Sequence, residues 1–104
     1  MLLVTEDLVL IGARDKRLHA IDRTDGAGVW KFAARGHFDS SPIVIGEHVI
    51  APSKDGRIYA VTLHEGTEHW VYDAGAPIVA SPAYSKGILV VATTDGQIIA
   101  LKIS

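Results

Sequence analysis

The chain has 104 residues, of which 48% are hydrophobic and 21% are charged, with a net charge of −2 at pH 7. This length and composition indicate one small globular domain, exclude a disordered chain, and give no basic excess that would predict a nucleic-acid partner. There is no cysteine, which excludes disulfides and thiolate metal sites and leaves the redox compartment open.

The first residues of the chain do not predict a targeting segment. Residues 1–7 contain no basic residue, and their apolar run is only four residues long. They therefore do not predict a signal peptide, and the localisation stays unknown from this chain. No apolar stretch reaches the roughly 20 residues of a membrane helix, so no membrane span is predicted.

Short apolar segments rich in Val and Ile, bounded by Gly, Pro, Asp and Ser, predict strands, and helical patterns are nearly absent. The predicted strands are, in chain order, 3–5, 8–13, 17–22, 29–33, 41–45, 48–53, 57–62, 69–73, 81–85, 88–93 and 97–102. Asp-Gly pairs at 55–56 and 95–96 are a strong hairpin signal between two strands. Lys16 takes the place of this glycine in the first copy, so we expect a more strained turn or a turn of another type there.

A repeat with a period of 40 residues organises these strands. Four kinds of residue recur at this spacing: Asp15, Asp55 and Asp95; Ala20, Ala60 and Ala100; Gly26 and Gly66; Trp30 and Trp70. Four short antiparallel strands in each repeat are typical of a β-propeller blade. We predict an all-β partial β-propeller over 1–104, with repeats 1–40, 41–80 and 81–104 and the last strand of the third blade missing. A β-sandwich of eleven strands is the alternative, although it gives no reason for the period.

The segment from Ala20 to Trp30 and its copy from Ala60 to Trp70 resemble the tryptophan-docking motif of the PQQ-like (pyrroloquinoline quinone) β-propeller repeat family. The resemblance covers essentially the whole chain. It implies structural blade-docking roles for Ala20, Gly26, Trp30, Ala60, Gly66, Trp70 and Ala100. We expect each tryptophan to pack at a blade junction, because a large flat ring needs a small facing residue and a partner for its N–H. Thr62 replaces Asp22 in the second copy, so we expect the side-chain hydrogen bond of that carboxylate to be weaker or missing there.

The same resemblance separates two classes of function. Quinone-dependent dehydrogenases of the family hold calcium with acidic and amide side chains, whereas this chain has neither Asn nor Cys and matches none of their site residues. We therefore expect no enzyme and no cofactor, but a scaffold or binding module for protein–protein interaction, similar to the BamB-like non-catalytic members, which are often periplasmic or in the cell envelope. A fragment of a PQQ-dependent dehydrogenase, with PQQ and calcium, and a sensor domain of a kinase-linked protein are the alternatives.

Two polar groups could suggest chemistry. His64 and His69 flank two glutamates, but their spacing is not that of helical zinc sites, and Gly66 breaks the segment into a turn. The three repeated aspartates lie in predicted hairpin turns, where Asp binds its own backbone. We interpret both groups as structural and predict no catalytic or metal-binding residue.

A local cluster of cations is the candidate partner-binding face. In an up-and-down blade, the hairpin between the second and third strands shares one edge with the connection to the next blade. The residues predicted at this edge are Arg14, Arg17, Arg35, His37, Lys54 and Arg57. An ordinary solvated rim and a site for an acidic partner or anion are both open. Phe38 is either an exposed contact beside them or part of a blade junction.

The third repeat contains three of its four strands, which leaves a strand edge unpaired and a ring incomplete. We expect either the C-terminal portion of a larger propeller or an oligomer-forming unit, in particular a homo-oligomer. In both cases the partner is a protein or further propeller blades.

Overall fold

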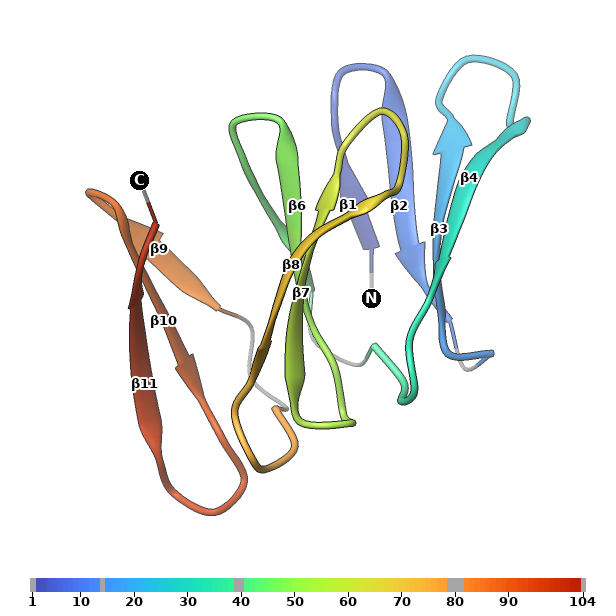
Figure 1. Cartoon of the computed structure of the whole chain (residues 1–104). Helices are drawn as coiled ribbons and strands as arrows, with labels where there is room; N and C mark the ends of the chain where they lie inside the picture. The colour runs from blue at the N-terminus through green and yellow to red at the C-terminus, as the bar shows by residue number, and fades with distance from the viewer. Residues whose placement is uncertain (1, 14, 39–40, 79–81, 104) are drawn as a thin grey trace.

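The computed structural model describes residues 2–13, 15–38, 41–78 and 82–103 (Figure 1). Within these ranges the chain is all-β, and it has no helix long and apolar enough to cross a membrane. The strands are β1 (Leu2–Val4), β2 (Leu8–Gly12), β3 (Arg17–Asp22), β4 (Gly28–Ala33), β5 (Ile43–Ile45), β6 (His48–Pro52), β7 (Arg57–Thr62), β8 (Glu68–Asp73), β9 (Ala83–Ser85), β10 (Ile88–Ala92) and β11 (Ile98–Lys102).

These strands form three antiparallel sheets that lie side by side (Figure 1). The strand orders are β1-β2-β3-β4, β5-β6-β7-β8 and β9-β10-β11, and we refer to the sheets as blades 1, 2 and 3. The predicted all-β partial propeller, with two complete blades and a third of three strands, is therefore confirmed, and the sandwich is wrong. The largest shifts from the predicted bounds are at β5 and β9, which begin two residues late because Pro42 and Pro82 offer no N–H to a ladder.

The core consists of two layers, one at each blade junction. The first is formed by Leu10, Leu18 and Ala20 of blade 1, Phe38 of the connection, and Val49, Ala51, Tyr59 and Val61 of blade 2. The second is formed by Ile50, Ile58 and Ala60 of blade 2, Ala74 and Ile78 of the next connection, and Leu89 and Val91 of blade 3. Because side chains alternate between the two faces of a strand, β6 and β7 supply both layers and are buried nearly throughout.

The turn between β2 and β3 keeps the shape of its copies despite its lysine. Lys16 has a φ of 67°, close to the 87° and 89° of Gly56 and Gly96, so the backbone is strained rather than re-formed. The carbonyl of Lys16 accepts the N–H of Ala34 at 2.8 Å, as that of Gly56 accepts the N–H of Ala74 at 2.7 Å. The conformation is retained because the connection to the next blade hangs on this carbonyl.

Candidate blade-docking and partner-binding sites

Trp30 joins blade 1 to the turn between β7 and β8 of blade 2. Its Nε1–H donates a hydrogen bond to the carbonyl of Leu63 at 2.8 Å. Gly66 of the same turn lies directly against the indole, since a Cβ on Gly66 would stand 2.3 Å from Trp30 Cδ2. Ala20 pairs with Trp30 in the β3–β4 ladder and is 1% exposed. The ring thus lies between a small residue of its own blade and a glycine of the next.

A β-bulge precedes each tryptophan. Ala20 pairs with Trp30 while Ile21 pairs with Gly28, so Val29 is an extra residue in β4. The same shift occurs in blade 2, where Ala60 pairs with Trp70 and Val61 pairs with Glu68. A bulge bends a strand and redirects its side chains, and here it precedes the docking ring in both blades. The sequence analysis missed this feature, although the equal Gly-to-Trp spacing in both copies reflects it.

The turns before these bulges are held differently. In the first, Asp22 Oδ1 accepts hydrogen bonds from the N–H of Thr24 at 2.8 Å and from its hydroxyl at 2.5 Å, and these bonds lower the pKa of Asp22. In the second, the Thr62 hydroxyl accepts from the N–H of Thr67 at 3.0 Å. The bond to the second residue along the chain is replaced by one across the turn, so the substitution does not leave Thr62 without a hydrogen bond.

Trp70 lies in a more open environment than Trp30. It faces Ala60 and packs against the second core layer beside Ile103, which stands 40 residues after Leu63. A cavity of about 710 Å³ borders this tryptophan, with Ile45, His48, Tyr72, Leu101 and Ile103 among its lining residues. In the described part of the chain, no turn covers Trp70 as the Gly66 turn covers Trp30.

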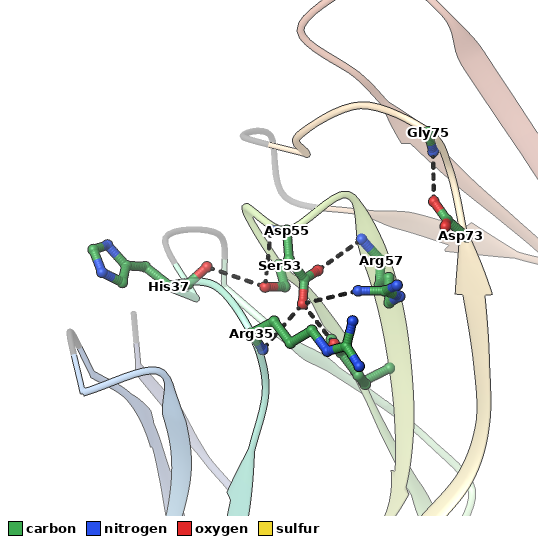
Figure 2. A network of polar contacts seen from close by, with 8 residues as sticks. Arg35, His37, Ser53, Asp55, Arg57, Asp73 and Gly75 are labelled. Atoms are coloured by element: carbon green, nitrogen blue, oxygen red, sulfur yellow. Dashed lines mark hydrogen bonds and ion pairs between the residues drawn. The ribbon is translucent and has the colours of Figure 1, made fainter.

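The second candidate site surrounds Asp55 at the loop edge of blades 1 and 2 (Figure 2). The Asp55 carboxylate is 7% exposed and accepts hydrogen bonds from the N–H of Arg57 at 2.9 Å, the N–H of Arg35 at 3.2 Å and the hydroxyl of Tyr59 at 2.5 Å. Beside it, the buried Ser53 hydroxyl donates to the carbonyl of His37 at 3.4 Å. The repeated Asp thus binds its own turn and also fastens the preceding connection.

The equivalent aspartates make different contacts. Asp15 is more exposed and binds the N–H of Arg17 at 3.0 Å and His19 Nε2 at 2.9 Å. Asp95 accepts from the amide of Gln97 at 3.0 Å. Each of the three binds within its own turn region, and they do not converge on one centre.

The predicted cations lie mostly together. Residues 34–38 and the β6–β7 turn share the lower edge of the view in Figure 1. The N–H of Lys54 donates to the carbonyl of His37 at 2.9 Å, and the guanidinium of Arg57 lies 4.0 Å from Asp55. Arg17 stays in blade 1, where its guanidinium lies 3.8 Å from Asp15. Arg14 lies outside the described residues.

Phe38 belongs to the blade junction. It is 2% exposed and packs edge-on against Tyr59, with ring centroids 6.1 Å apart. Phe38 is therefore part of the core and not an exposed contact beside the cations.

The two histidines considered for metal binding have separate neighbours. His64 Nδ1 lies 3.4 Å from Glu47 Oε2, whereas the ring of His69 stacks on that of His48 at 4.1 Å. Among the described residues, no group of three or more His, Asp or Glu side chains is placed to hold a metal ion.

Comparisons with known proteins agree with this architecture. A family model described as outer membrane protein assembly factor BamB matches residues 2–104. The structure is similar to BamB from Moraxella catarrhalis, with a TM-score of 0.83 and 25% identity, over 97% of this chain and 32% of that one. The chain therefore spans about a third of the length of the BamB chain that it matches. No match was found among curated proteins.

Two computationally designed proteins share the fold. Ika4 matches with a TM-score of 0.81 and 18% identity, over 99% of this chain and 64% of that one. Ika8 matches with a TM-score of 0.79 and 19% identity, over 98% of this chain and 32% of that one.

The contact between Gly66 and Trp30 predicts unequal effects for two equivalent substitutions. Gly26 and Gly66 have φ values of 74° and 71°, but a Cβ on Gly26 would meet nothing within 4 Å. We expect Gly26→Ala to cost about 1 kcal/mol from backbone strain alone. Gly66→Ala should cost about 1–3 kcal/mol more, because the methyl group displaces the indole. Urea denaturation followed by tryptophan fluorescence measures both, and equal losses would contradict docking of the ring on Gly66.

The Tyr59–Asp55 contact predicts a dependence of stability on alkaline pH. Burial, together with the hydrogen bond to Asp55, raises the pKa of Tyr59 to about 12, from about 10 in an unfolded chain. Between these two values the unfolded chain releases the proton and the folded chain keeps it, so the free energy of unfolding falls as the pH rises.

Comparison with Tyr59→Phe isolates this effect. The variant should be less stable than wild type at pH 8, because Asp55 loses a donor, and the difference should shrink between pH 10 and pH 12. Urea denaturation followed by circular dichroism measures it, with Tyr84→Phe on the exposed part of β9 as the control. A difference that stays constant over this range would show that the buried hydroxyl does not titrate in this way.

Proposed function

The chain belongs to the repeat family described as outer membrane protein assembly factor BamB, and we propose that it is a non-enzymatic β-propeller module that mediates protein–protein interaction. The observation that carries this proposal is the similarity of fold to BamB over nearly the whole chain. Because the chain spans only part of that protein, the role of a complete ring is itself part of the proposal.

An enzymatic role has less support in the residues present. The repeat family also includes enzymes. In the quinone-dependent dehydrogenases, calcium needs converging acidic and amide oxygens, whereas this chain has no Asn, and its three repeated aspartates each bind within their own turn. We therefore propose no cofactor.

The loop edge around Asp55 is the surface we propose for an acidic partner. Arg35 and Lys54 are exposed there, and His37 and Arg57 are half-buried beside them. The Asp55 carboxylate is itself turned inward and engaged by three donors, so it offsets little of the outward positive potential. A local cluster of cations on a chain of net charge −2 favours encounter with negatively charged segments.

Polyglutamate serves as a probe of this surface. We expect wild-type protein to bind it at low ionic strength, and the double variant Arg35→Ala/Lys54→Ala to bind about tenfold more weakly. Fluorescence anisotropy over a series of salt concentrations measures both. The control is Lys31→Ala/Lys86→Ala, which removes the same charge from exposed positions elsewhere. Equal weakening in the two double variants would locate no binding face at the loop edge.

Further blades are the second kind of partner that we propose, either in a longer chain or in a second copy. Val9, Ile11 and Ile21 on the outward face of blade 1 are half-buried, whereas the residues 40 positions later, Val49, Ala51 and Val61, are fully buried at a junction. An apolar face of this kind is normally covered, since stacked repeats bury the faces that one repeat cannot bury alone.

Light scattering tests whether the end faces associate. We expect the 104-residue protein to form oligomers whose mass rises with concentration, and Ile21→Lys on the blade 1 face to reduce the oligomer mass. Val44→Lys, at an exposed position of β5, should not reduce it. A stable monodisperse monomer would contradict this part of the proposal.

A further inference from the structure

The outer strand of blade 3 has an unpaired edge. In the described residues β11 pairs only with β10, whereas β3 and β7, the strands at the same place in blades 1 and 2, also pair with β4 and β8. A strand edge presents a row of unsatisfied N–H and C=O groups and accepts an extended segment readily.

Exposure along β11 shows what the missing neighbour covers elsewhere. Ile98 is 77% exposed, while Leu18 and Ile58 at the same position of the earlier blades are fully buried. Ala100 is exposed, while Ala20 and Ala60 are buried. Part of this burial in blades 1 and 2 comes from the next blade, and part comes from the aromatic residues paired across the ladder.

The two complete blades define the register of the strand that fits this edge. Ala20 and Ala60 pair with Trp30 and Trp70, and the two residues that precede these alanines in the same strand face pair with a second aromatic. Those pairs are Leu18 with Phe32 and Ile58 with Tyr72. A strand docked in the same way places a tryptophan opposite Ala100 and an aromatic residue opposite Ile98.

The cavity beside Trp70 fits the turn that precedes such a strand. At the first junction, the equivalent position beside Trp30 is filled by the turn that contains Leu63 and Gly66, four residues before the tryptophan of blade 2. At the second junction, Ile103 occupies the place of Leu63, its N–H donates to the carbonyl of Gly87 at 2.7 Å, and the remaining space is open. One continuous segment, a glycine turn followed by a strand, would fill the cavity and cover the edge.

We propose that the β11 edge and the cavity beside Trp70 together bind a segment of a partner protein with the pattern Gly-x-x-x-Trp-x-aromatic, added antiparallel to β11. Both internal copies carry this pattern, at Gly26–Trp30–Phe32 and at Gly66–Trp70–Tyr72. The inference rests on the proposed role in protein–protein interaction and names the chemistry of one partner. Main-chain hydrogen bonds supply affinity and the tryptophan opposite Ala100 supplies specificity.

A labelled peptide with the sequence of residues 63–74 is the probe. We expect saturable binding to the 104-residue protein by fluorescence anisotropy, together with a rise in its melting temperature. The same peptide with Trp70→Ala keeps its charge and should bind about tenfold more weakly. In the protein, Ala100→Glu should weaken binding of the original peptide to a similar degree, and Ala33→Glu, at an exposed position of β4, should leave it unchanged.

Three results would overturn the inference. They are absence of binding at millimolar peptide, equal binding of the Trp70→Ala peptide, and equal effects of Ala100→Glu and Ala33→Glu in protein that is folded by circular dichroism. If the segment stabilises the protein only when fused after residue 104, it acts within one chain and a separate partner is ruled out. Polyglutamate binding that persists while the peptide fails would leave the proposed loop-edge function intact and reject only this site.

Discussion

The docking of Trp30 on the turn of the next blade is the contact on which the architecture depends. The indole N–H is satisfied by the Leu63 carbonyl, and its face meets a glycine that tolerates no side chain. Ring and glycine belong to different repeats, so their distance along the chain is fixed by everything between them. An insertion in the connection would have to be absorbed before the glycine reached the ring. The uninterrupted 40-residue period is the record of this constraint.

Blade 2 shows how such a stack divides its core. The side chains of β6 and β7 alternate between two junctions, so one pair of strands contributes half of each apolar layer. Neither layer exists within a single blade, and stability therefore resides mainly in the contacts between neighbours. Blades 1 and 3 each have one face of this kind turned outward, which is why both ends of the chain resemble interfaces more than surfaces.

Most of the fold could be predicted from the sequence, because the strand pattern is strictly periodic and the turns carry their usual residues. The bulges before Trp30 and Trp70 could not, since pairing register is a property of two strands and leaves only an equal spacing in each copy. The inward role of Asp55 was also missed. Its sequence context matches that of Asp95, and only the three-dimensional approach of Arg35 distinguishes them. Phe38 was ambiguous because one aromatic residue in a connection has no periodicity to place it.

The residue that follows the repeated aspartate by four positions differs in every blade: His19, Tyr59 and Ile99. In blade 2 the hydroxyl of Tyr59 meets the aspartate under a connection that is also tied to it, and its ring contacts Phe32 and Phe38. A folding chain that stacked blade 3 directly on blade 1 would bring Ile99 to this position, with no donor for the carboxylate and no ring for the two phenylalanines. The apolar layers of the blades are similar enough to be exchanged, whereas this position is not. It acts as an address that distinguishes the correct order of blades from a shuffled one.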